Sequence, residues 1–357
     1  MSLAHLGFGP ALAAAFEPHA ETGLAPGRVA VEHRGALVLL TGEGEVRASV
    51  PGRLRHRAVS PLDLPAVGDW VAYSRGAQDD RAVVEAVLPR RTAFVRKTAG
   101  FESVEQVVAA NVDVVFCVTS LVDDLNARRL ERYLTLAWES GAEPVVVLTK
   151  ADLCPDVDAA TAAVSGVTFG VPMHAVSAVT GEGVAGLEAH LTGGRTVALV
   201  GTSGVGKSTL VNRLCGAERL ATAAVRPDGR GRHTTTHREL VPLEAGGCLI
   251  DTPGMRELVL WDAEDGLDRA FEDVDELAVQ CRFNDCEHRT EPGCAVRAAI
   301  ATGALDAARL ESYRHLQREL RYVEIRQDAR ARSEERKRWA ATGKIGREQA
   351  RQKRGMP

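Results

Sequence analysis

A glycine-rich segment in the middle of the chain has the composition and spacing of a phosphate-binding loop. GTSGVGKST follows the apolar run TVALV and precedes the helix-forming TLVNRLCG, the context that the pattern G-x(4)-G-K-[ST] requires. In such a loop, backbone N–H groups face phosphate oxygens and the helix N-terminus adds partial positive charge. We expect Lys207 to reach the β and γ phosphates of a nucleotide and Ser208 to ligate Mg²⁺. The predicted nucleotide-binding residues of this segment are Gly201, Thr202, Ser203, Gly204, Val205, Gly206, Lys207, Ser208 and Thr209.

A second nucleotide motif lies downstream, at the end of another apolar run. CLIDTPGM carries Asp251 and Gly254 in the pattern D-x-x-G, in which the aspartate supports Mg²⁺ through water and the glycine amide senses the γ phosphate. The intervening segment, RPDGRGRHTTTHREL, is rich in Gly and Arg and indicates a first switch loop. Either Thr234 or Thr235 could complete the Mg²⁺ shell when the γ phosphate is present, and we favour Thr235.

The group that orients the attacking water is not the usual one. Met255 stands directly after D-x-x-G, where many GTPases have a glutamine. His233, just before the switch threonines, is our candidate, because an imidazole can accept a proton from water and would move with the loop. A solvent-exposed histidine without a catalytic role is the alternative.

Two strand ends upstream of the phosphate loop carry residues suited to reading guanine. VVVLTKAD ends an apolar run with Thr149, Lys150 and Asp152. The Asp152 carboxylate could accept hydrogen bonds from guanine N1 and N2, an edge that adenine does not offer, and Lys150 could lie along the base plane. Ser177 and Ala178 in HAVSA resemble a second guanine element, in which a backbone amide meets O6. Since most proteins of this class have Asn in place of Thr149, we expect somewhat weaker nucleotide affinity.

The elements that must position these motifs are two different kinds of domain. Within residues 96–262, continuous apolar runs alternate with helix-length segments, which predicts an α/β domain with a parallel sheet buried on both faces. Residues 28–95 show short alternating runs broken by turn residues, which predict an OB-like β-barrel. Such a barrel either binds an oligonucleotide or only supports its neighbour, and aromatic residues for base stacking are scarce. Residues 1–27 form an N-terminal extension.

A cluster of cysteine and histidine follows the α/β domain. CRFNDCEHRTEPGC brings four soft ligands, Cys281, Cys286, His288 and Cys294, into one short segment. Three thiolates and one imidazole suit a closed tetrahedral structural Zn²⁺ site, with no position left for a catalytic water. Unliganded cysteines beside a surface histidine are the alternative. The remaining cysteines are interpreted as buried small hydrophobic side chains: Cys117, Cys154, Cys215 and Cys248.

Composition and charge exclude several classes of protein. The chain has 357 residues and a net charge of −4, and it has neither a membrane-spanning apolar stretch nor a basic signal-peptide start. From Arg309 onward, fifteen Lys and Arg stand against seven Asp and Glu. A basic helical tail on an acidic body suggests a polyanionic partner such as RNA, although a solvated helix with paired charges would look similar. Residues 263–357 are therefore predicted to be a helical zinc-binding domain with a basic tail.

The five nucleotide motifs are complete but rotated, since the guanine-reading elements precede the phosphate loop, the switch threonine and D-x-x-G. This rotation, with a β-barrel before it and metal ligands after it, resembles the circularly permuted GTPases of the RsgA (YjeQ) family. The resemblance covers GTSGVGKST, GRGRHTTT, DTPG and the Cys/His cluster, and nearly the whole chain.

The resemblance implies a GTP hydrolase that acts late in maturation of the small ribosomal subunit and is stimulated by that subunit. It implies GTP and GDP as ligands, Mg²⁺ with GTP, one structural Zn²⁺, contact with rRNA and no membrane. We expect a cytoplasmic monomer. Two alternatives remain: a nucleotide-independent RNA-binding zinc protein with a degenerate GTPase core, and an ATP-using P-loop kinase or ATPase.

Overall fold

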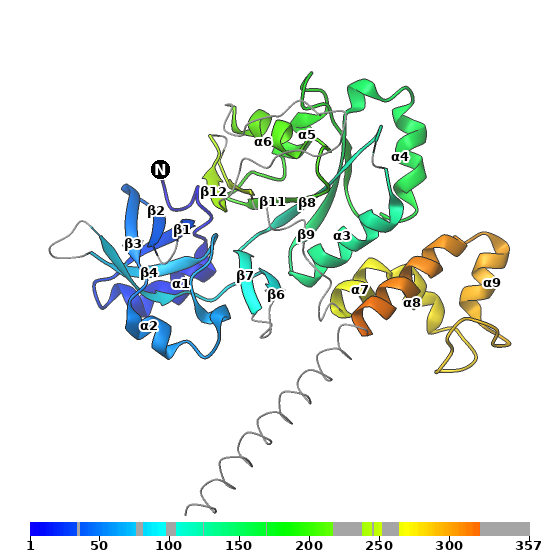
Figure 1. The fold of residues 1–357 in the computed structure, drawn as a ribbon, viewed down its shortest axis with the longest axis horizontal. Helices are drawn as coiled ribbons and strands as arrows, with labels where there is room; N and C mark the ends of the chain where they lie inside the picture. Colours follow the sequence, from blue (N-terminus) through cyan, green and yellow to red (C-terminus); the bar gives the residue numbers. More distant parts are fainter. Residues whose placement is uncertain are drawn as a thin grey trace, which may run out of the picture.

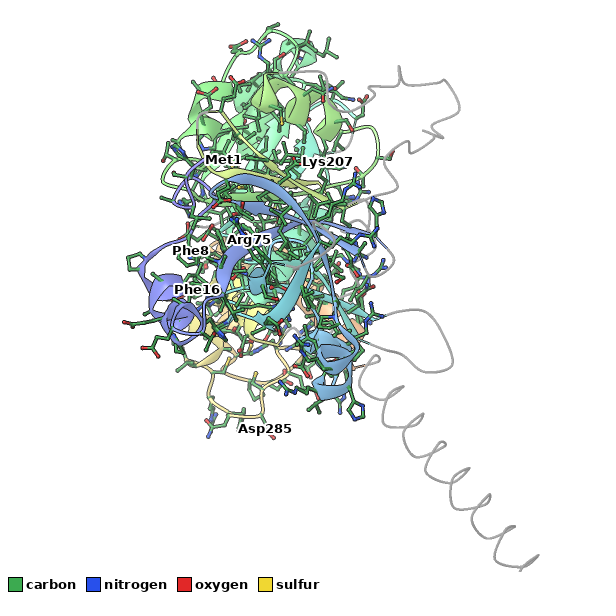
Figure 2. All side chains as sticks on the ribbon, turned by 90° about the vertical axis from the view of Figure 1, so that its left-hand side faces the viewer. Met1, Phe8, Phe16, Arg75, Lys207 and Asp285 are labelled. Atoms are coloured by element: carbon green, nitrogen blue, oxygen red, sulfur yellow. The ribbon has the colours of Figure 1, made fainter. Side chains whose placement is uncertain are left out.

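The strands of the N-terminal barrel and of the α/β domain join into one continuous sheet (Figure 1). The computed structural model describes residues 1–33, 36–75, 81–97, 105–123, 125–168, 170–216, 238–244, 246–251 and 264–321. The strand order of the large sheet is β10-β9-β8-β11-β13-β12-β1-β2-β3-β5-β4. The two domains meet where β12 pairs with β1, with Glu239 opposite Val31.

The barrel is closed by its first strand, which pairs with both β2 and β4. Its five strands are β1 Ala25–His33, β2 Ala36–Thr41, β3 Gly44–Ser49, β4 Trp70–Ser74 and β5 Ala82–Val87. A short helix, α2 (Gly52–Arg57), and a 3-10 turn, η1 (Pro61–Asp63), connect β3 to β4. Alternate residues such as Leu37, Leu39 and Val71 fill the interior, as the period of two in the sequence predicts. The predicted OB-like barrel is confirmed.

The N-terminal extension packs between the barrel and the α/β domain. Its helix α1 (Pro10–Ala20) begins at a proline, which suits the first helical turn. The Phe8 ring lies 4.8 Å from the ring of Trp70, whose side chain is buried in the barrel. On the other side, the His5 carbonyl accepts a 3.2 Å hydrogen bond from the Gly247 amide. The extension therefore holds the two domains together.

In the described part of the α/β domain, five strands run parallel, β8 Val114–Ser120, β9 Glu143–Thr149, β10 Met173–Ala175, β11 Thr196–Val200 and β13 Cys248–Asp251, with β12 (Glu239–Pro242) antiparallel beside β13. Every residue of β8 is buried. Val115 and Cys117 point into the core on one side of the sheet, and Val114 and Phe116 point into the other. This confirms the predicted parallel sheet that is buried on both faces.

Among the described residues, the helices that follow the parallel strands are α3 Ala127–Glu139, α4 Val157–Ser165, α5 Val184–Glu188 and α6 Lys207–Cys215. Between the barrel and β8, β6 (Ala93–Lys97) and β7 (Glu105–Ala110) form a separate antiparallel pair. In Figure 1 this pair lies between the barrel and α3.

The C-terminal helices lie at the lower right of Figure 1, and the first of them packs against α3. They are α7 Glu264–Ala270, α8 Glu272–Ala278 and α9 Ala295–Thr302, followed by helical residues 307–321. A Cβ atom at Gly266 would collide with the Thr135 carbonyl oxygen, so glycine permits the close approach of α7 to α3. The predicted basic tail beyond residue 321 lies outside the described residues. Among the helices that the structure describes, none is long and apolar enough to cross a membrane.

Candidate functional site: a nucleotide-binding edge and a metal cluster

The strand order gathers the separated sequence motifs at one edge of the sheet. Because β8, β9, β10, β11 and β13 run parallel, their carboxyl ends lie together. TKAD begins at the last residue of β9, the Ser177 segment follows β10, the phosphate loop follows β11, and Asp251 ends β13. Ligands of open α/β sheets bind at this edge. The rotated motif order is therefore compatible with one contiguous site.

The phosphate loop depends on its glycines for its backbone shape. Gly204 and Gly206 have φ angles of 85° and 94°, a region that side chains with a Cβ atom rarely adopt. A Cβ atom at Gly201 would collide with the Val118 carbonyl oxygen. Lys207 begins α6, and its Nζ donates to the carbonyl oxygens of Gly201, at 2.7 Å, and Thr202. The lysine ammonium group therefore lies over the loop, where the phosphates of a nucleotide would bind.

The first guanine motif is anchored to this loop. Thr149 is buried, and its Oγ1 lies 2.5 Å from the Val205 carbonyl oxygen and 3.1 Å from that of Thr119. A hydroxyl has one proton to donate, and Val205 is the nearer acceptor. The Thr149 hydroxyl therefore connects the end of β9 to the phosphate loop.

Lys150 and Asp152 follow on a tight turn. Lys150 has φ 60°. Its Nζ lies 2.6 Å from Oδ2 of Asp123, a residue that follows β8 in the chain. Asp152 lies exposed in the 3-10 turn η2 (Ala151–Leu153). The sequence reasoning missed Asp123. Its position just after a buried strand was the signal that could have found it.

The second guanine element forms a compact turn beside the first. The Val176 carbonyl accepts a 3.1 Å hydrogen bond from the Ala151 amide. Ser177 is fully buried, and its Oγ accepts a 3.1 Å hydrogen bond from the Thr180 amide. This serine therefore shapes the turn, and Ala178 beside it remains partly exposed.

Several predicted residues are not placed by these contacts. The backbone of Asp251 ends β13 at the nucleotide edge, and nothing is described of its side chain. His233, Thr234, Thr235, Gly254 and Met255 lie outside the described residues. Ser208 and Thr209 occupy the first turn of α6, next to Lys207. Their position matches the expected geometry of a phosphate-binding helix N-terminus.

The four predicted metal ligands come together in one cluster. The ligand atoms of Cys281, Cys286, His288 and Cys294 lie within 4.8 Å of one another. The Cys281 and Cys294 sulfurs are 3.8 Å apart, and each lies 3.5 Å from His288 Nδ1. In a tetrahedral site, bond lengths of about 2.3 Å to sulfur and 2.0 Å to nitrogen give S–S and S–N separations of about 3.8 Å and 3.5 Å. The cluster therefore fits a tetrahedral metal ion, with His288 binding through Nδ1.

The loop that carries these ligands is held by its own surroundings. Glu291 accepts hydrogen bonds from the amides of Glu287, Arg289 and Thr290. The backbone N–H of Glu291 itself, followed by these neighbouring N–H groups, lowers the pKa of its carboxyl. Arg314 donates to the His288 carbonyl oxygen at 2.7 Å. These contacts help to orient the loop around its four ligand residues.

Comparison with known proteins decides the family. The RsgA GTPase family model matches residues 87–261. A curated RsgA protein of Opitutus terrae is 49% identical over 95% of this chain and 95% of its own length. The chain belongs to the RsgA GTPase family. It is therefore a GTPase, a hydrolase acting on GTP. A Streptomyces coelicolor relative, also named a small ribosomal subunit biogenesis GTPase RsgA, is 48% identical over 99% of this chain and 96% of its own.

Solved structures agree with the fold of this family. YjeQ from Thermotoga maritima is 28% identical, with a TM-score of 0.63 over 83% of this chain and 98% of its own. YloQ, described as a circularly permuted GTPase, matches with a TM-score of 0.61 over 85% of this chain and 96% of its own, at 23% identity. The predicted circularly permuted fold is confirmed.

Proposed function

We propose that this chain binds the small ribosomal subunit late in its maturation and that the subunit stimulates its hydrolysis of GTP. Family membership makes the chain a ribosome-biogenesis GTPase. The curated relatives are named for biogenesis of the small subunit, which supports that subunit as the partner. The observation that carries the GTP-binding part of the proposal is the assembly of both guanine elements and the phosphate loop at one edge, joined by the Thr149 hydroxyl.

Guanine recognition is proposed for the turns after β9 and β10. The exposed Asp152 carboxylate would accept hydrogen bonds from guanine N1 and N2, and the Ala178 amide would donate to O6. Asp123 holds the Lys150 ammonium group, so the aliphatic part of Lys150 would cover one face of the base. Adenine lacks these donors and this acceptor, which favours GTP over ATP.

Phosphate binding is proposed for the loop and the start of α6. Lys207 would exchange its two loop carbonyls for the β and γ phosphates, while the loop amides and the α6 N-terminus stabilise negative charge. Family membership implies Mg²⁺ with GTP, and Ser208 and Thr235 are proposed to hold it. Asp251 would act on it through water, and the Gly254 amide would sense the γ phosphate.

Water activation is proposed for His233, because Met255 offers no group that could orient water. The proposed His233 function requires the switch loop to be placed against the phosphates. Binding of the subunit would place the loop in this way, so the unstimulated rate should be low.

Zinc is the metal proposed for the Cys/His cluster. Three thiolates and one imidazole prefer Zn²⁺ over harder divalent ions, and the separations of the ligand atoms suit a closed structural site. We propose that the ion stabilises the loop between α8 and α9. No position remains for a substrate, so a catalytic role is not proposed.

The decisive experiment measures GTP hydrolysis by the full chain with and without purified small ribosomal subunits, with large subunits as the control. Small subunits are expected to stimulate the rate and large subunits are not, and a rate unchanged by small subunits would contradict the proposal.

Competition of a labelled GTP analogue by GTP but not by ATP separates this function from that of an ATP-using enzyme. Loss of stimulation in His233→Ala with GTP binding retained would support its assignment, and full turnover would contradict it. We also propose that the chain acts as a monomer in the cytoplasm.

A further inference from the structure

The barrel carries one strongly basic described segment, the helix α2 between β3 and β4. Its sequence GRLRHR supplies Arg53, Arg55, His56 and Arg57, all of them exposed. Arg53 forms an ion pair with Glu85, and the charge of Arg57 also lowers the pKa of Glu85, after the larger effect of the Arg53 hydrogen bond. Within the described residues, neither Arg55 nor Arg57 is part of an ion pair of its own. Glu85 therefore compensates only part of the positive charge of α2, and positive charge remains.

The helix is fixed to the barrel, so its charges have defined positions. Leu54 packs against the barrel core. Beyond the helix, Asp63 accepts hydrogen bonds from the amides of Val59, at 2.8 Å, and Ser60, at 3.0 Å. Figure 1 shows α2 at the lower end of the barrel, on the side away from α6 and the phosphate loop. A ligand on α2 would leave the nucleotide edge uncovered.

The face that OB-fold barrels commonly use for oligonucleotides is less suited to them here. That face is formed by the second and third strands and nearby loops, which correspond to β2 and β3. These strands contain no aromatic residue, so they offer no stacking platform for bases. Among the described residues of β2, β3 and the turn between them, the exposed charged side chains are Glu43, Glu45 and Arg47, and Glu43 already pairs with Arg75.

We propose that α2 is a docking surface for an RNA phosphate backbone, with Arg55 and Arg57 as its principal contacts. Guanidinium groups bind phosphate oxygens through paired N–H groups, and phosphate contacts position a protein without reading sequence. The inference rests on the proposed function, since the RNA would belong to the small ribosomal subunit. It assigns the barrel a binding surface at its α2 end in place of the β2–β3 face.

A structural role is the competing explanation, because Arg55, His56 and Arg57 occupy the last turn of α2. Positive side chains there interact favourably with the negative end of the helix dipole. That role would affect thermal stability and would not affect binding to RNA. The two explanations therefore predict different measurements.

The test compares two double variants of the full chain that remove the same charge. Arg55→Gln/Arg57→Gln removes the proposed contacts, and Arg47→Gln/Arg75→Gln removes two exposed arginines from the strand side of the barrel. Affinity for purified small subunits is measured between 50 and 300 mM salt, with GDP affinity and the melting temperature as folding controls. The single variants Arg55→Gln and Arg57→Gln serve if the double variant does not fold.

We expect Arg55→Gln/Arg57→Gln to lower the affinity for the subunit about tenfold or more near 100 mM salt. The slope of log K against log salt should become shallower by about 1.5. The control variant Arg47→Gln/Arg75→Gln should change the affinity and the salt slope much less. Arg55→Lys/Arg57→Lys should retain most of the affinity. Equal losses in both pairs, or no loss in the α2 pair, would overturn the inference. Weaker binding with an unchanged salt slope would indicate a protein contact and would also overturn it. Failure of the unmodified chain to bind small subunits would instead refute the proposed function.

Discussion

The hydroxyl of Thr149 lies 2.5 Å from the carbonyl oxygen of Val205, which ties the guanine-reading turn directly to the phosphate loop. Only β8 stands between the two strands that carry these segments. The sequence predicted weaker nucleotide affinity because threonine replaces asparagine, whose side chain can help to hold the loop. In the structure the threonine hydroxyl holds the loop instead, so we now expect little gain in affinity from Thr149→Asn.

Removal of this hydroxyl should weaken nucleotide binding. Thr149→Val keeps the shape of the side chain and leaves the Val205 carbonyl without its partner. A buried hydrogen bond of this kind contributes about 1 kcal/mol, which corresponds to about fivefold in affinity. Titration of a fluorescent GDP analogue measures the change.

Thr196→Val is the matched control for this substitution. Thr196 begins β11 at the opposite end of the sheet, and its buried Oγ1 has no hydrogen-bond partner within the described part of the chain. The same replacement should leave nucleotide affinity unchanged there. Equal affinities of the Thr149→Val variant and the unmodified chain would show that the bond to Val205 does not support the nucleotide site.

The nucleotide edge could be predicted from sequence because each motif lies directly after an apolar strand. Parallel strands then bring Lys150, Ser177 and Gly201 to one edge, whatever their order along the chain. Contacts between segments that are distant in the chain leave no comparable pattern in the sequence. Arg28, for example, is buried and donates to the carbonyl oxygens of Leu6, Gly68 and Asn111. No periodicity in the sequence indicates which carbonyls an arginine will reach, so the packing of the N-terminal extension could not be predicted.

The C-terminal helices should depend on a buried ion network at α3. Arg309 Nη1 lies 2.8 Å from Glu131 Oε1, and its Nη2 lies 2.8 Å from Asp273 Oδ1. The side chains of Arg309 and Glu131 are only 3% and 1% exposed. Removing one partner of such a pair leaves a buried charge uncompensated, which costs about 3 to 5 kcal/mol. Arg309→Ala should therefore strongly destabilise the C-terminal helices, as measured by urea unfolding and limited proteolysis.

An exposed pair between the same two regions provides the comparison. Arg128 on α3 lies 3.1 Å from Glu311, with side chains 58% and 68% exposed. Exposed pairs contribute about 0 to 1 kcal/mol, so Arg128→Ala should have little effect. Similar destabilisation by the two alanine variants would mean that burial of the Arg309 network is not what stabilises this junction.

Metal removal should unfold the Cys/His loop and leave the nucleotide edge intact. The loop between α8 and α9 contains mainly exposed residues, so it has little apolar core to hold it without the ion. We expect one equivalent of zinc on purification, and Cys281→Ser should lose it and become sensitive to protease between residues 279 and 295. Cys154→Ser, outside the cluster, should retain the metal. GDP affinity should be unchanged in both variants. If the unmodified chain held no more metal than the Cys281→Ser variant, the proposed metal site would be excluded.

A histidine pair beside the second guanine element should make the stability of this region depend on pH. His174 Nε2 lies 3.0 Å from His190 Nε2. Burial lowers the pKa of both rings, and the charges of His174 and Arg195 further lower that of His190, while Glu143 opposes them. As the pH falls through about 6.5, these two histidines therefore take up protons in the unfolded chain before they do so in the folded chain.

The stabilising contribution of this pair is consequently complete above the unfolded pKa and is lost as the pH falls toward the lower folded pKa. The short N–N distance gives a further reason, since two protonated rings have no acceptor left for the hydrogen bond between them. NMR titration of the two rings should give pKa values below those of the same histidines in urea-unfolded protein. His174→Gln/His190→Gln should reduce the loss of unfolding free energy between pH 7 and 5. Folded-state pKa values at or above the unfolded reference would reverse the sign and contradict this explanation.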